Sequence, residues 1–64
     1  MQVNGRNVTG KAGMTLQAYL EEAGYRIERI VVERNGEIVS KTAYNAVLLT
    51  EADTIEVVSF VGGG

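Results

Sequence analysis

The stretch TIEVVSFV, residues 54–61, decides the fold because it has the pattern of a β-strand that is apolar on both faces. It is rich in β-branched residues, which are enriched in strands. Successive side chains of a strand point to opposite faces. The apolar residues here occupy both, with Ile55, Val57 and Val61 on one face and Val58 and Phe60 on the other. A strand of this kind is usually central in its sheet, so we predict that residues 54–61 form the central strand.

Two Asn-Gly pairs predict β-hairpins in the rest of the chain, at Asn4-Gly5 and at Asn35-Gly36. Asn and Gly both tolerate the positive φ angles of a two-residue hairpin turn. Each pair separates two β-prone segments, which are Met1–Val3 with Asn7–Thr9 and Ile30–Arg34 with Glu37–Val39. The first hairpin is short, so the limits of its strands are the least defined.

One helix is predicted between these hairpins. Thr15 is a suitable N-cap, since its hydroxyl can accept a hydrogen bond from an early helical N–H. Apolar residues then recur at helical spacing on one face, at Leu16, Tyr19, Leu20 and Ala23. Gly24 stands where a left-handed residue would end the helix. Residues 40–49 show no clear period and predict a crossing loop with at most one helical turn, followed by a turn at residues 50–53.

The predicted order β-β-α-β-β-β indicates an α+β domain over residues 1–61 with its helix packed on one face of the sheet. A single helix crossing a small mixed sheet of four to five strands is the β-grasp arrangement. The opposite face of the sheet would then be open, and Val58 and Phe60 would lie on it. The alternative is that a loop, such as residues 41–49, covers them. Because clustered exposed apolar residues usually mark a contact surface, we expect these two side chains to help seat a partner protein.

Composition excludes most catalytic classes. The 64-residue chain has neither cysteine nor histidine, so it lacks disulfides, thiol and Ser-His-Asp nucleophiles, and the usual zinc and copper ligands. Its net charge of −2 disfavours nucleic acid, and its apolar runs are too short to span a bilayer. We expect a non-enzyme that binds no metal or cofactor of its own. We also expect it to bind no nucleic acid or membrane and to be cytoplasmic, because a lack of cysteine fits a reducing compartment.

The carboxylates do not alter this expectation. Glu21 and Glu22 are adjacent on the predicted helix, so their side chains do not face each other and both should be solvated. Glu51 and Asp53 could be metal ligands, but turn-forming and capping roles are favoured, since Asp is frequent in turns. The reactive group that remains is the α-carboxylate of Gly64.

The three final glycines can be interpreted in two ways, as a frayed tail or as a working segment. Glycine has no Cβ, so Gly62, Gly63 and Gly64 could thread a narrow channel in another protein. Four extended residues reach at most about 13–14 Å, far enough to carry the Gly64 carboxylate into a partner's active site. An ionised carboxylate is a poor electrophile, so it would first need activation with ATP supplied by the partner.

The whole chain resembles the ThiS family, the small sulfur-carrier proteins of thiamine biosynthesis, which have a ubiquitin-like β-grasp fold. The resemblance rests on VVERNGEIV at residues 31–39 and on DTIEVVSFVGGG at residues 53–64. The N-terminal segment and the helix after Thr15 also fit, so nearly all 64 residues are covered.

The resemblance implies a sulfur-transfer role centred on Gly64. An E1-like adenylyltransferase would adenylate the Gly64 carboxylate with ATP, and a sulfur donor such as a cysteine desulfurase would allow its conversion to a thiocarboxylate. Thiazole synthase would then receive the sulfur. Gly63, which has no side chain, would be the narrow residue next to the reactive one, and Gly62 would lengthen the tail. Three alternatives stay open: a carrier for molybdopterin or another sulfur pathway, a protein modifier joined to lysines through Gly64, and a binding module with an idle tail.

Overall fold

The computed structural model describes residues 1–60 and contains one α-helix, two 3-10 helices and five strands within that range. The strands are β1 (Gln2–Val3), β2 (Arg6–Asn7), β3 (Ile30–Arg34), β4 (Glu37–Ile38) and β5 (Thr54–Ser59). The helices are α1 (Leu16–Glu22) and the 3-10 helices η1 (Ile27–Arg29) and η2 (Lys41–Ala43). The predicted tail, residues 62–64, and Val61 lie outside the described residues.

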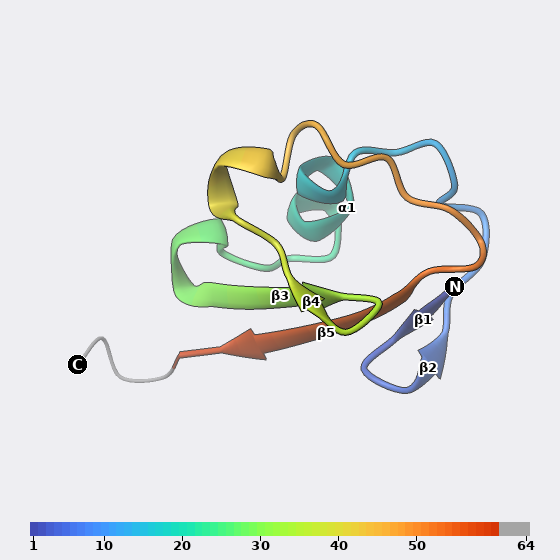
Figure 1. Cartoon of the computed structure of the whole chain (residues 1–64), viewed down its shortest axis with the longest axis horizontal. Coiled ribbons are helices and arrows are strands. Elements are labelled where there is room, and N and C mark those ends of the chain that lie inside the picture. Colours follow the sequence, from blue (N-terminus) through green and yellow to red (C-terminus); the bar gives the residue numbers. More distant parts are fainter. Residues whose placement is uncertain (61–64) are drawn as a thin grey trace.

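The five strands form one mixed sheet in the order β2-β1-β5-β3-β4 (Figure 1). β5 pairs parallel with β1 and antiparallel with β3, so it occupies the centre of the sheet as predicted. Figure 1 shows α1 on one side of this sheet. The α+β β-grasp architecture predicted from the sequence is therefore confirmed.

Both Asn-Gly pairs form two-residue hairpin turns. Asn4 has φ 51° and Gly5 has φ 80°, while Asn35 has φ 53° and Gly36 has φ 86°. Positive φ at both central positions matches the right-handed twist of the strands that the turn joins. The strand β3 covers Ile30–Arg34 as predicted. The strands β2 and β4 are shorter than predicted, since β2 covers Arg6–Asn7 rather than residues 7–9 and β4 ends at Ile38.

The Asn4 side chain extends the short ladder of the first hairpin. Its Oδ1 accepts a hydrogen bond from the Val57 N–H at 2.7 Å, and its Nδ2 donates to the Val57 carbonyl at 3.2 Å. The amide thus takes the place of a further β1 residue beside the central strand.

The helix α1 has the predicted caps. The Thr15 hydroxyl accepts a hydrogen bond from the Ala18 N–H at 3.0 Å. At the other end, Gly24 has φ 91°, and the Tyr25 N–H donates to the Leu20 carbonyl, which is the Schellman arrangement. Leu16, Tyr19 and Leu20 are buried as expected. Ala23 is exposed, contrary to prediction, because the helix ends there and the chain turns away.

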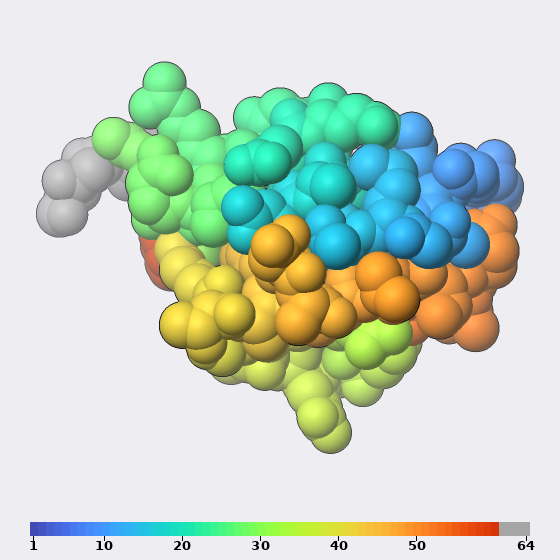
Figure 2. All heavy atoms as spheres, turned by 90° about the horizontal axis from the view of Figure 1, so that it is seen from above, coloured from blue at the N-terminus to red at the C-terminus, as the bar shows by residue number. Residues whose placement is uncertain are grey.

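Residues 40–53, the crossing segment, lie beside α1 on the same side of the sheet as the helix (Figure 1, Figure 2). Figure 2 shows this segment and the helix side by side on one face of the molecule. The Gln17 N–H donates to the Tyr44 carbonyl, and the Leu16 N–H donates to the Val47 carbonyl, so the segment is attached to the start of α1. Tyr44 follows η2 and is 0% exposed. The predicted single turn is confirmed, whereas the burial of Tyr44 was not predicted.

The buried core lies between the sheet and this layer of helix and crossing segment. Its side chains come from every part of the described chain: Met1, Val3, Leu16, Tyr19, Leu20, Ile30, Val32, Tyr44, Leu49, Ile55 and Val57. The core therefore fills only one side of the sheet, which leaves the other side of β5 outside it.

Candidate functional site

The end of β5 is where the described chain leads toward the predicted reactive residue. Phe60 is the last described residue, and its N–H donates a hydrogen bond to the Arg29 carbonyl at 2.7 Å. This bond continues the β5–β3 pairing one residue beyond the strand. Gly62, Gly63 and Gly64, the predicted tail and reactive residue, lie outside the described residues. The structure therefore fixes the point from which the final residues continue.

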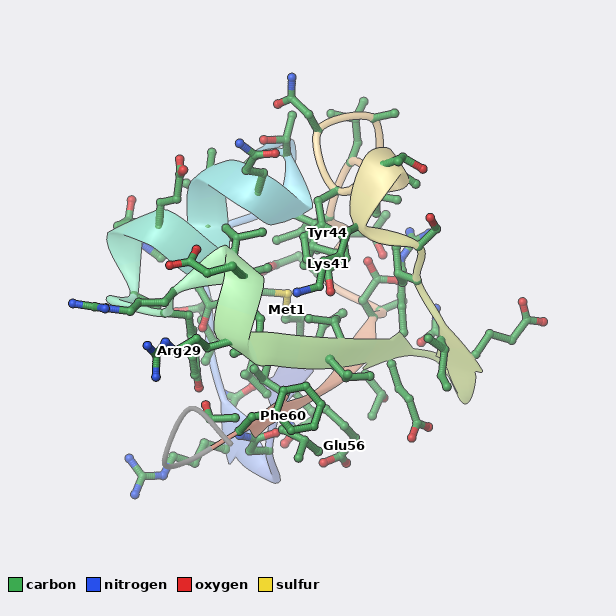
Figure 3. All side chains as sticks on the ribbon, turned by 90° about the vertical axis from the view of Figure 1, so that its left-hand side faces the viewer. Met1, Arg29, Lys41, Tyr44, Glu56 and Phe60 are labelled. Atoms are coloured by element: carbon green, nitrogen blue, oxygen red, sulfur yellow. The ribbon has the colours of Figure 1, made fainter. Side chains whose placement is uncertain are left out.

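The two faces of β5 have different environments. Ile55 is 0% exposed and Val57 is 8% exposed, and both belong to the core. On the opposite face, the side chains of Val58 and Phe60 are each 57% exposed. Figure 3 shows Phe60 on the side of the sheet away from Tyr44 and Lys41. Residues 41–49 lie on the helix side, so the alternative that they cover Val58 and Phe60 is wrong.

Further side chains share the exposed face with Val58 and Phe60. Val31 lies directly opposite Val58 in the β3–β5 register, so the two side chains point the same way. Ile38 of β4 lies opposite Glu33 of β3, and its side chain is 71% exposed. Sequence reasoning missed both apolar neighbours. The two-residue turn at Asn35-Gly36 could have placed Ile38 opposite Glu33, because such a turn fixes the hairpin register.

A shallow hollow of about 270 Å³ lies beside Phe60, at the same end of the sheet. Arg26 and Arg29 are part of its lining, and both are exposed. Figure 3 shows Arg29 near the level of the sheet, at the end where Phe60 follows β5. The hollow therefore places the positively charged residues Arg26 and Arg29 close to Phe60.

Asp53 anchors the start of β5 and is the buried carboxylate of the described chain, at 4% exposure. Its Oδ2 accepts hydrogen bonds from the Thr50 N–H at 2.9 Å and from Arg34 Nε at 3.1 Å. Its Oδ1 accepts from Asn35 Nδ2 at 3.0 Å. The predicted turn and capping role is what the structure shows. The carboxylate joins the β3–β4 hairpin to the turn before β5 and so helps to set the position of the central strand.

The hydrogen bonds to Asp53 also determine its ionisation. Burial alone would raise the pKa of this carboxyl group. Hydrogen bonds from Thr50, Asn35 and Arg34, together with the positive charge of Arg34, outweigh burial and hold the pKa of Asp53 below its ordinary value. Because the folded-state pKa is lowered, the ionised carboxylate stabilises the folded state fully above the unfolded-state pKa of about 3.9. That contribution is lost as the pH falls through the lower folded-state pKa.

We predict that Asp53→Asn lowers the free energy of unfolding at pH 7 and that the gap from the unsubstituted chain narrows as the pH falls below about 4. Urea unfolding between pH 7 and pH 3 measures both quantities. Glu51→Gln, which removes the same charge from an exposed position in the same turn, is the control and should change little. A gap that stays constant over this pH range would show that the ionised form of Asp53 does not contribute.

Neither a group of metal ligands nor a membrane-spanning helix is found within residues 1–60. Among residues 1–60, no three or more acidic side chains are grouped in a way that could bind a metal ion. Within the same range, α1 is too short to span a bilayer, and no helix there has the length and apolar character that spanning requires.

The whole length of the chain, residues 1–64, matches the model of the ThiS family. The chain belongs to the ThiS family. It is 45% identical to the sulfur carrier protein ThiS of Bacillus subtilis, and the alignment covers 100% of this chain and 98% of that protein. The structure of a ThiS thiamine biosynthesis protein from Geobacter metallireducens has a TM-score of 0.76 to this chain at 30% identity, covering 98% of this chain and 96% of that one.

The chain also resembles part of a larger protein. It is 45% identical, over its full length, to a thiazole synthase of Magnetococcus marinus, of which the match covers 20%. A thiazole synthase of Paramagnetospirillum magneticum is 42% identical over 97% of this chain, and the match covers 19% of that protein. The chain thus spans about one fifth of the length of these two relatives, so each contains a ThiS-like segment within a longer protein.

Proposed function

We propose that this ThiS-family chain is a cytoplasmic sulfur carrier in thiamine biosynthesis, with Gly64 as the residue that bears the sulfur. The observation that carries the proposal is the match over nearly the full length of both chains to the sulfur carrier protein ThiS of Bacillus subtilis. In this role the chain is a co-substrate of its partner enzymes and not a catalyst.

The proposed chemistry starts at the Gly64 α-carboxylate, which is ionised at neutral pH because its reference pKa is about 3.3–3.7. A carboxylate oxygen attacks the α-phosphorus of ATP in an E1-like adenylyltransferase, and pyrophosphate leaves. A donor such as a cysteine desulfurase holds its sulfur as a persulfide, and a thiol reductant supplies the two electrons that release it as hydrosulfide. The hydrosulfide then attacks the acyl carbon. AMP leaves with the electrons of the broken C–O bond, and a thiocarboxylate remains.

Thiazole synthase is the proposed acceptor of this sulfur. Two proteins named thiazole synthase contain a segment similar to this chain, which supports a working relation between the two. The family match favours this pathway over molybdopterin synthesis and over attachment to target lysines.

The test of the proposal is ATP-dependent activation of the chain by the adenylating enzyme of its host. The purified chain, that enzyme and ATP should form an acyl-adenylate at Gly64, detected by pyrophosphate release and by a mass gain of one adenylate group. If no E1-like enzyme of the host activates the chain, the proposal is wrong.

We further propose that Val58 and Phe60 seat the carrier on its enzyme partners, since both are exposed next to the residues that lead to Gly64. Phe60→Ala should lower kcat/KM for adenylation by about tenfold, because aromatic side chains in interface cores often contribute more than 1 kcal/mol. The pyrophosphate assay measures the loss. Leu48→Ala removes a similarly exposed apolar side chain from outside β5 and serves as the control. Equal rates for Phe60→Ala and the unsubstituted chain would rule out docking through this ring.

A further inference from the structure

The two hairpin turns, Asn4-Gly5 and Asn35-Gly36, each place an asparagine directly before a glycine. Asparagine is a thermolabile residue. In this dipeptide the backbone nitrogen of the glycine can attack the side-chain carbonyl carbon of the asparagine. Because glycine has no Cβ, nothing shields its nitrogen or restricts the backbone angles that bring it close. Both turns are therefore candidate sites of deamidation.

The atoms of this reaction balance with water as the other reactant. The Gly36 nitrogen forms a bond to Cγ of Asn35, the bond from Cγ to Nδ2 breaks, and ammonia leaves with the proton that Gly36 loses. Water then adds to one carbonyl carbon of the five-membered succinimide and opens the ring. Addition at the former side-chain carbonyl gives aspartate. Addition at the backbone carbonyl gives isoaspartate, in which the main chain runs through the side-chain carbons.

In the folded chain, two hydrogen bonds to distant residues hold the amide of Asn35. Its Nδ2 donates to Asp53 Oδ1 at 3.0 Å, and its Oδ1 accepts from the Thr54 N–H at 2.9 Å. Cyclisation needs a rotation that brings Cγ against the Gly36 nitrogen, and the amide cannot make it while both partners hold it. One of the two bonds is to a charged acceptor, the stronger kind. The reaction must therefore wait until this part of the structure opens locally.

Conversion of Asn35 to an acid reverses its contact with Asp53. The buried Asp53 carboxylate joins the β3–β4 hairpin to the turn before β5. A carboxylate at position 35 sets an acceptor oxygen against Asp53 Oδ1, where the amide donates. Arg34 bonds to the other oxygen, Oδ2, so it does not replace the lost donor. Two carboxylates that share a site disfavour each other's ionised form. Isoaspartate also adds a carbon to the backbone of a two-residue turn.

Asn4 offers a comparison within the same chain. Its amide is also held at both ends, by the N–H of Val57 at 2.7 Å and by the carbonyl of Val57 at 3.2 Å. Conversion of Asn4 keeps the hydrogen bond from the Val57 N–H. Its new oxygen faces a backbone carbonyl, which has a partial charge only, rather than a carboxylate. The same reaction should therefore damage the first hairpin less than the second.

From these contacts we propose that Asn35 is a deamidation site whose conversion releases the Asp53 anchor of β5, and that the folded hairpin holds this reaction back. Water does not reverse the loss of ammonia, and the product folds less stably than the parent. A chain that has converted therefore opens more often, which limits the working lifetime of the protein. The strand that loses its anchor is the one that leads toward Gly64.

Trypsin places the two sites in separate peptides, with Asn4 in residues 1–6 and Asn35 in residues 35–41. The full chain is incubated at pH 7 in buffer and in guanidinium chloride, and the peptides are compared by mass spectrometry. Each conversion adds about 1 Da. A methyltransferase that labels isoaspartate identifies the rearranged product. In denaturant both peptides should convert at similar rates, and in buffer the Asn35 peptide should convert at least about tenfold more slowly.

Asp53→Ala tests the protecting hydrogen bond, because it removes the acceptor of Asn35 Nδ2. In buffer the Asn35 peptide of this variant should convert about tenfold faster than that of the unsubstituted chain, while the Asn4 peptide should change little. Glu51→Ala, which removes an exposed carboxylate from the same turn, is the matched control and should alter neither rate. Equal acceleration of both peptides would overturn the protecting role of Asp53. If Asp53→Ala does not fold, the comparison of buffer with denaturant still decides.

Asn35→Asp reproduces one product and tests the release of the anchor. Its Tm, followed by circular dichroism, should lie about 8 °C or more below that of the unsubstituted chain. Asn4→Asp adds the same charge to the other hairpin and should lower Tm by less than half as much. Equal Asn35 rates in buffer and denaturant, or a Tm of Asn35→Asp within about 2 °C of the unsubstituted chain, overturns the proposal. Neither result bears on sulfur transfer, so the proposed function is tested separately.

Discussion

A chain shortened to end at Gly62 should carry no detectable sulfur, although it still ends in a glycine carboxylate. The two deleted residues correspond to about 7 Å of extended chain. Reaction needs the attacking oxygen within about 3–3.5 Å of its target, and a misplacement of only 1 Å can lower a rate a hundredfold. Adenylation measured by pyrophosphate release should therefore fall to background.

The same shortened chain should fold normally. The buried core found within residues 1–60 extends from Met1 to Val57, so its Tm should match that of the full chain within about 2 °C. Gly62→Ala, which keeps the length of the tail, is the control and should retain measurable adenylation. Sulfur loading of the shortened chain at the full rate would contradict the role of Gly64.

Tyr44→Ala should have the largest effect on stability. The side chain is fully buried, and burial raises the pKa of its hydroxyl, opposed by a hydrogen bond with the backbone of Val32. Replacing a buried aromatic residue with alanine costs about 3–5 kcal/mol. The free energy of unfolding expected for 64 residues is roughly 3–10 kcal/mol. The variant should thus be either mostly unfolded or only marginally stable at 25 °C. Urea unfolding followed by circular dichroism measures this.

Tyr44→Phe separates the ring from its hydroxyl. It keeps the aromatic volume and should lose only about 1 kcal/mol, the typical net value of one hydrogen bond. Tyr25→Ala, at a half-buried position, should cost less than Tyr44→Ala. If Tyr44→Ala unfolded at the same urea concentration as the unsubstituted chain, the crossing segment would not be part of the core.

The elements that could be predicted from sequence are those with local causes. Asn4-Gly5 and Asn35-Gly36 specify their turns through positive φ, and Thr15 and Gly24 cap α1 with their own backbone and side-chain geometry. The central place of β5 followed from apolar residues on both of its faces. These features depend on residues within a few positions of one another, so a single sequence contains them.

The conformation of the crossing segment was harder to predict because contacts with other parts of the chain determine it. Tyr44 follows a single 3-10 turn and has no periodic apolar neighbours, so nothing local marks it as buried. Its position depends on backbone hydrogen bonds to the start of α1, including the one from Gln17 to its carbonyl. Ala23 shows the reverse case, since it fits the helical period yet lies where the helix ends.

The candidate site likewise has features that a single sequence predicts and features that it does not. The exposure of Val58 and Phe60 follows from strand alternation and a single helix on one face of the sheet. The placement of Val31 opposite Val58 depends on the register between β3 and β5, which are separated by residues 35–53. That register depends on non-local contacts, among them the hydrogen bonds of Asp53 to Arg34 and Asn35. A single sequence carries no local pattern that would fix it.

The intact mass of the chain after sulfur loading tests the central claim most directly. The chain is incubated with ATP, the host's adenylating enzyme, a sulfur donor and a thiol reductant, and is then analysed by mass spectrometry. The account predicts a species heavier by about 16 Da, as one oxygen of the Gly64 carboxylate is replaced by sulfur, and its absence from the chain that ends at Gly62. A mass that stays unshifted when the enzyme and donor are active would contradict the account.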